Sequence, residues 1–75
     1  MRFDANRLKE GPTNPDTDLP KWVEWDGERF ETPSFEEIRG WVFDSTCESL
    51  AGETVEPDGV DPDGFPSWLL AVGLV

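Results

Sequence analysis

Apolar and polar residues alternate most clearly over residues 22–31, which read WVEWDGERFE. A period of two places successive side chains on opposite faces of a strand, and the central Asp-Gly pair is preferred in type I′ turns. The pattern therefore predicts a β-hairpin in which Val23 faces Phe30. Val23, Trp25 and Phe30 share one face that requires a core, and Trp22 lies at the base of the opposite, polar face.

A helical spacing of apolar residues follows directly after the hairpin. Ser34 and Glu37 have the spacing of a capping box, which satisfies backbone donors at a helix start. Thr32, followed by a proline at the first helical position, is an equally good start. Gly52 is a natural stop about five turns later. The sequence thus predicts one principal helix at about residues 34–50.

The apolar residues of this predicted helix cover a wide arc and leave a narrow acidic stripe of Glu37, Asp44 and Glu48. Because a two-stranded hairpin is marginal alone, we expect the hairpin to cover one side of the arc and the C-terminal segment to cover the other. The apolar residues are Phe35, Ile38, Trp41, Val42, Phe43, Cys47 and Leu50.

The C-terminal part contains two Pro-Asp-Gly triplets, residues 57–59 and 62–64, followed by an apolar segment. Proline at the second and glycine at the fourth position suit a type I turn. Ser67 is positioned to cap a short helix over residues 68–72, which Gly73 would end. The turns are therefore predicted to deliver this last helix into the core.

Residues 1–20 are interpreted as an N-terminal arm and a Pro-rich loop. Phe3 and Leu8 are the large apolar anchors of the arm, which suits either a short strand or the start of a helix, and three prolines between residues 11 and 20 favour a loop. Residues 21–75 are predicted to form a single small α+β domain, a β-hairpin packed on one main α-helix with a short C-terminal helix.

The charge is strongly acidic, with 17 acidic and 6 basic residues and a formal net charge of −11. This charge disfavours direct binding to nucleic acid or to an anionic membrane, and the even spread of carboxylates resembles the composition of halophilic proteins. A single cysteine, Cys47, fits a reducing cytoplasm. No apolar run is long enough to cross a bilayer, so we expect a cytoplasmic protein that does not contact membranes.

The acidic turns are the best candidates for a cation site, because hard cations such as Ca²⁺ prefer carboxylate and carbonyl oxygens. Asp58, Asp61 and Asp63 are weak candidate ligands, and solvated turns are the simpler interpretation. Zinc sites need several Cys or His ligands, whereas this chain has one Cys and no His. No cofactor is predicted.

No arrangement of residues indicates catalysis. Cys47 has no histidine to activate it and acidic neighbours that disfavour a thiolate, so a small buried side chain is the better interpretation. Paired carboxylates carry no signal among so many. The sequence predicts a protein that is not an enzyme.

The ending VEPDGVDPDGFPSWLLAVGLV resembles the C-terminal end of small uncharacterised bacterial and phage-type proteins, which close on a Pro-Asp-Gly, Gly-x-Pro-Ser-Trp-Leu-Leu, Gly-Leu pattern. Those proteins often carry Cys and His near the turns, where this chain has Thr54, Asp61 and Asp63. The resemblance implies a recurring structural unit of turns and a terminal apolar segment, and it implies no zinc role here.

The function predicted from the sequence is protein–protein interaction with an unknown protein partner. Trp22 is a candidate anchor, since Trp is enriched among interface hot spots, and Glu37, Asp44 and Glu48 are candidate charged contacts. The alternatives are a DNA-mimic inhibitor of a nucleic-acid-binding protein, which would use the same acidic stripe, and a weak divalent-cation module.

Overall fold

The computed structural model describes residues 4–74, so Phe3 and Val75 lie outside the described residues. Within them the chain combines short strands with helices, which confirms the α+β class. The elements in chain order are η1 (Ala5–Arg7, a 3-10 helix), β1 (Lys9–Glu10), β2 (Thr13–Asn14), β3 (Leu19–Pro20), β4 (Trp22–Trp25), β5 (Glu28–Glu31), α1 (Phe35–Asp44), β6 (Cys47–Glu48), β7 (Thr54–Val55) and α2 (Trp68–Ala71).

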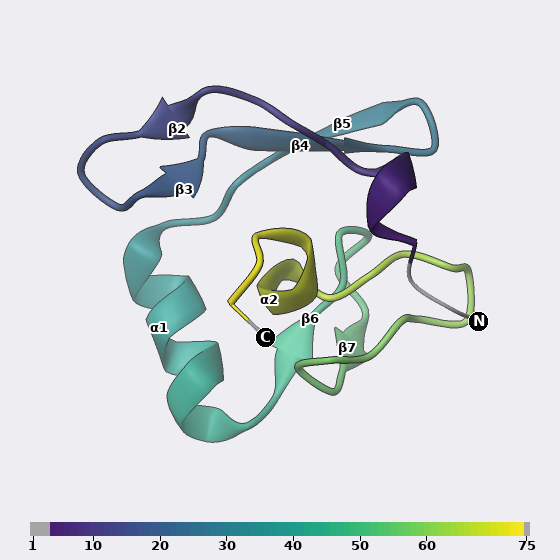
Figure 1. The fold of residues 1–75 in the computed structure, drawn as a ribbon. Helices are drawn as coiled ribbons and strands as arrows, with labels where there is room; N and C mark the ends of the chain where they lie inside the picture. The colour runs from purple at the N-terminus through teal and green to yellow at the C-terminus, as the bar shows by residue number, and fades with distance from the viewer. Residues whose placement is uncertain (1–3, 75) are drawn as a thin grey trace.

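The predicted hairpin is present as β4 and β5, and β1 pairs antiparallel with β4 to complete a three-stranded sheet (Figure 1). Val23 lies opposite Phe30, as predicted. Asp26 and Gly27 both have positive φ, 55° and 82°, which is the requirement of a type I′ turn. The hairpin is thus confirmed in position, register and turn chemistry.

The segment predicted as a Pro-rich loop contains a small hairpin, in which β2 pairs antiparallel with β3. The carbonyl oxygen of Asn14 accepts hydrogen bonds from the amides of Thr17 and Asp18, at 3.2 and 2.7 Å. Asp18 has a positive φ of 61°, a conformation that Asp tolerates better than most residues. The hairpin places Leu19 in the core.

Helix α1 begins where the capping box predicts. The Ser34 hydroxyl accepts a hydrogen bond from the Glu37 amide at 3.2 Å, and Ser34 itself has the extended conformation of an N-cap residue. The start of the helix is therefore confirmed at Ser34, and not at Thr32.

The predicted end of this helix, near residue 50, is wrong. α1 stops at Asp44, because Ser45 adopts the left-handed conformation with a φ of 57°. The chain then forms β6, which pairs antiparallel with β7. Cys47 and Ser49 are buried while Glu48 between them is exposed, so the burial pattern changes from a helical period to a period of two.

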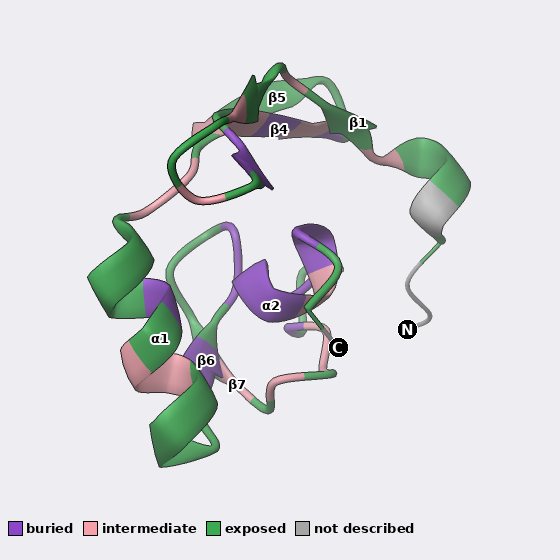
Figure 2. Ribbon diagram, turned by 60° about the vertical axis from the view of Figure 1, so that its left-hand side comes forward, coloured by how far each residue is buried: buried purple, intermediate pink, exposed green. Residues whose placement is uncertain are grey.

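The core is built around α2, which lies between the three-stranded sheet and the β6–β7 pair (Figures 1 and 2). The Ser67 hydroxyl caps α2 as predicted, accepting from the Leu70 amide at 3.0 Å, and Trp68 is buried. α2 contacts both α1 and β6. The C-terminal helix is thus confirmed, whereas the arrangement is not simply a hairpin packed on one main helix. The buried apolar residues are Leu19, Val23, Trp25, Ile38, Cys47, Leu50, Trp68, Leu69, Ala71 and Val72.

Candidate functional site

The two Pro-Asp-Gly triplets form the tight turns that the sequence predicts. The Gly59 amide donates to the Glu56 carbonyl oxygen at 2.8 Å, and the Gly64 amide donates to the Asp61 carbonyl oxygen at 3.0 Å. Each bond joins the first and fourth residues of a turn, with proline at the second position. The acidic loop is therefore an ordered pair of turns.

Asp61, at the first position of the second turn, is buried with only 2% of its surface exposed. Its Oδ1 accepts hydrogen bonds from the amides of Asp63 and Phe65, both at 2.9 Å. Its Oδ2 accepts from the Ser49 hydroxyl at 2.6 Å. Both carboxylate oxygens are therefore engaged by groups of the protein.

Two buried serines extend this network across the fold. The Ser49 hydroxyl also accepts from the Glu53 amide at 3.2 Å, and Ser49 forms an antiparallel bridge with Ser67. The Ser67 hydroxyl donates to the Pro57 carbonyl oxygen while it caps α2. The network therefore ties the end of β6 to the acidic loop and to the start of α2.

The candidate cation ligands do not gather into one ligand set. Asp58 and Asp63 are exposed, whereas the Asp61 carboxylate accepts the internal hydrogen bonds described above. Across residues 4–74, no three Asp, Glu, Cys or His side chains are close enough together to hold a metal ion. The geometry assigns Asp61 a structural role. The sequence held a signal for this role, because Asp is favoured at the first position of a turn.

Cys47 is buried, as predicted, although it lies in β6 and not on a helix. Its Sγ contacts the Glu48 carbonyl oxygen at 3.3 Å, with the thiol as donor. The cysteine thus contributes to the core packing.

Trp22, the candidate anchor, is half-buried on β4. A Cβ atom at Gly11 would lie 2.4 Å from Cε2 of the Trp22 ring, so the ring packs directly on the Gly11 backbone. The Arg29 guanidinium carbon lies 4.0 Å from the centre of the same ring, a cation–π distance. Trp22 is therefore engaged within the protein by both neighbours.

The acidic stripe expected on one helix is interrupted. Glu37 and Asp44 are exposed on α1, but Glu48 is exposed on β6, beyond the end of the helix. The prediction that all three residues share one helix face is wrong, because the chain reverses at Ser45.

The outer face of α1 instead presents large apolar side chains. Phe35, Val42 and Phe43 are 49%, 54% and 75% exposed, and their spacing places them on one side of the helix. We call these three residues the apolar strip. The expectation that the hairpin and C-terminal segment cover them is wrong: Ile38 is the one fully buried residue of α1, and α1 is exposed over most of its length (Figure 2).

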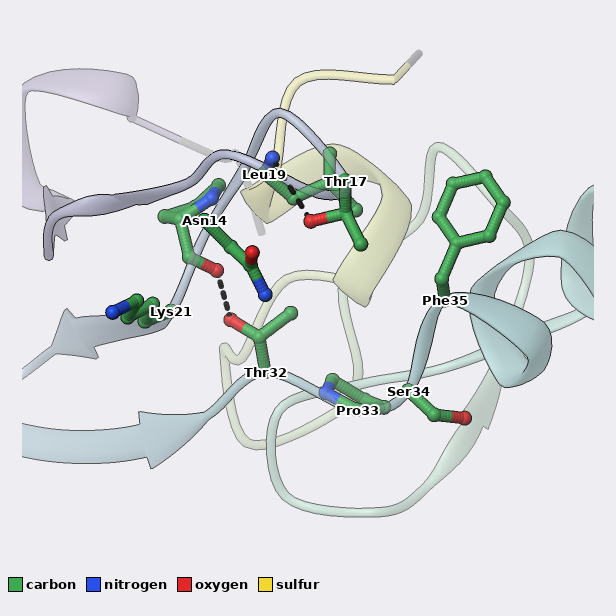
Figure 3. A pocket seen from close by; sticks show the side chains of 9 residues that line it. Asn14, Thr17, Leu19, Lys21, Thr32, Pro33, Ser34 and Phe35 are labelled. Carbon is green, nitrogen blue, oxygen red and sulfur yellow. Dashed lines mark hydrogen bonds between the residues drawn. The ribbon is translucent and has the colours of Figure 1, made fainter.

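A cavity of about 250 Å³ adjoins the first turn of α1. Asn14, Thr17 and Leu19 of the small hairpin line one side, and Thr32 and Phe35 line the other (Figure 3). The Thr32 hydroxyl donates to the Pro20 carbonyl oxygen at 2.6 Å. Because Phe35 belongs to both, the cavity and the apolar strip form one surface.

Comparison of the chain with protein-family models, with curated proteins and with solved structures finds no match. The resemblance of the C-terminal segment therefore stays a prediction. Within residues 4–74, none of the helices combines the length and apolar character needed to cross a membrane.

Proposed function

We propose that this chain acts by binding another protein through the outer face of α1. The observation that carries the proposal is the apolar strip. A chain of 75 residues has little apolar surface from which to build a core, yet this one exposes two phenylalanines and a valine on one side of α1. The largest apolar patch on the surface of a monomeric protein is often functional.

The position of the strip supports the same function. α1 contacts α2 and β6 and buries Ile38, whereas the strip is exposed, so a partner can cover the strip without disturbing the core. The Arg39 guanidinium carbon lies 5.7 Å from the centre of the Phe43 ring, and aromatic and arginine side chains are enriched at protein interfaces.

Photo-cross-linking tests the proposal. Phe43 is replaced by the photoreactive analogue p-benzoylphenylalanine, and the chain is irradiated in extract of its native cells. The matched control carries the same analogue at Glu28, an exposed residue of β5 next to the hairpin turn. We expect a defined protein adduct from position 43 that is absent from position 28.

Two additional substitutions, Phe35→Gln and Val42→Gln, test whether the adduct at position 43 depends on the rest of the strip. They remove the rest of the strip from exposed positions and keep good helix formers on α1. We expect them to abolish the adduct at position 43. Equal labelling at positions 43 and 28, or an adduct that survives both substitutions, would refute the proposed function.

A further inference from the structure

The contiguity of the cavity and the apolar strip indicates what kind of protein would fit them. Building on the proposed function, we infer that the partner presents a basic amphipathic helix, which lies along α1 and inserts one aromatic side chain into the cavity beside Phe35. Helix-in-groove contacts of this kind are a recurrent mode of recognition.

The strip is too small to be the whole contact surface. With about 150–250 Å² for a phenylalanine side chain, the exposed fractions of Phe35 and Phe43 amount to about 190–310 Å². A standard interface takes about 800 Å² from each partner. Since the strip extends only about 12 Å along α1 at 1.5 Å per residue, the adjoining cavity is the natural extension of the contact.

The size of the cavity favours a single side chain as its occupant. Its volume of about 250 Å³ is below the roughly 300–1,000 Å³ typical of small-molecule pockets. Leu19 and Phe35 supply apolar walls, whereas Asn14, Thr17 and Thr32 supply polar groups (Figure 3). This combination suits an aromatic ring with a polar atom, such as Trp or Tyr.

The charge around the surface favours a basic partner. Asp16 and Asp18 are exposed in the turn that borders the cavity, and Glu36 is exposed in the first turn of α1, next to Phe35. The basic residues near the same surface are Lys21, which lines the cavity, and Arg39 of α1. With a net charge of −11 on each chain, a second copy would be repelled, whereas lysines beside an apolar face would be attracted.

A designed peptide tests this inference. The probe is a fluorescein-labelled peptide of about 18 residues, long enough to form a helix, with Leu on one face, Lys on the other and one Trp at the centre of the apolar face. Fluorescence anisotropy at physiological salt measures its affinity for the full chain. Amide NMR shifts locate the contact, which we expect at residues 14–21 and 32–43.

Three matched variants separate the contributions. The double variant Val42→Gln/Phe43→Gln keeps the charge of the chain, and we expect it to bind the peptide at least about tenfold more weakly. Replacing the peptide Trp by Ala should weaken binding by a similar factor and abolish the shifts at residues 14–21. Replacing the peptide Lys by Glu should abolish binding.

The outcomes distinguish this inference from the proposed function. Equal binding of the Lys peptide to the double variant would mean attraction to the acidic surface alone and would overturn the inference, as would equal binding of the Glu peptide. A cross-linked adduct at position 43 combined with no binding of the Lys peptide would overturn the basic partner and leave the proposed function standing. A cross-linked adduct with a second copy of the chain would likewise overturn the basic partner and leave the proposed function standing.

Discussion

Asp61→Ala is the substitution for which the structure makes the sharpest prediction. The change removes the acceptor of three hydrogen bonds, from the Ser49 hydroxyl and the amides of Asp63 and Phe65. A donor left without a partner in a buried position costs about 1–3 kcal/mol. Ser49 is fully buried, whereas the turn amides are near the surface, where water can replace part of the loss.

We therefore expect Asp61→Ala to lower the free energy of unfolding by about 3–5 kcal/mol. A chain of 75 residues has a total of about 4–11 kcal/mol, so the variant loses a large part of its stability. Asp61→Asn keeps one oxygen as an acceptor but turns an NH₂ group toward Ser49. Its loss should be smaller, about 1–2 kcal/mol.

Urea unfolding monitored by tryptophan fluorescence measures these changes, since Trp68 and Trp25 lie in the core and report on its loss. The control is Asp58→Ala, which removes the same charge from an exposed position of the preceding turn. Its free energy of unfolding should stay within about 0.5 kcal/mol of the wild type. Coincident unfolding curves for Asp61→Ala and Asp58→Ala would refute the structural role of the Asp61 carboxylate.

Three further predictions test other contacts within the fold. Gly11→Ala places a Cβ atom 2.4 Å from the Trp22 ring, so we expect a displaced Trp22 indole NMR signal and a loss of about 1–3 kcal/mol in urea unfolding; an unchanged indole signal would contradict the packing. Ser67→Ala removes the cap of α2 and should cost about 0.5–2 kcal/mol, whereas a loss under 0.5 kcal/mol would contradict that role. Cys47 should react with a thiol reagent about 100-fold more slowly in the folded chain than in urea, because it must wait for local opening; equal rates would contradict its burial.

The features that the sequence predicted correctly depend on neighbours within a few residues. The Asp26-Gly27 turn sets the register of its own hairpin, and Ser34 and Ser67 each bond an amide three residues ahead. These interactions are short-range, so the local sequence carries the information needed to place them.

The end of α1 could not be placed in this way. Cys47 and Leu50 have a spacing that fits a helix, and helix propensity is only a weak preference that tertiary contacts override. β6 gains a strand partner in β7, and the serine bridge joins it to Ser67. β7 and Ser67 are farther along the chain than the three or four residues over which a helical pattern is read. The reversal at Ser45 was therefore not visible in the sequence.

The candidate site, too, was only partly predictable from the sequence. The sequence contained Phe35, Val42 and Phe43 within a wide apolar arc, but it could not indicate which part of the arc would be covered. The short α2 occupies the centre of the fold, and Ile38 is the one residue of α1 that is fully buried. The apolar strip and the cavity beside Phe35 therefore became visible only in the folded chain.

The sequence by itself determined the α+β class, the β4–β5 hairpin, both helix starts and the two acidic turns, because each depends on backbone geometry and hydrogen bonds close along the chain. The tertiary structure decided where α1 ends, that Asp61 is buried between Ser49 and its own turn, and which apolar residues remain exposed. Burial depends on which surfaces meet, and those surfaces come from segments distant in the sequence.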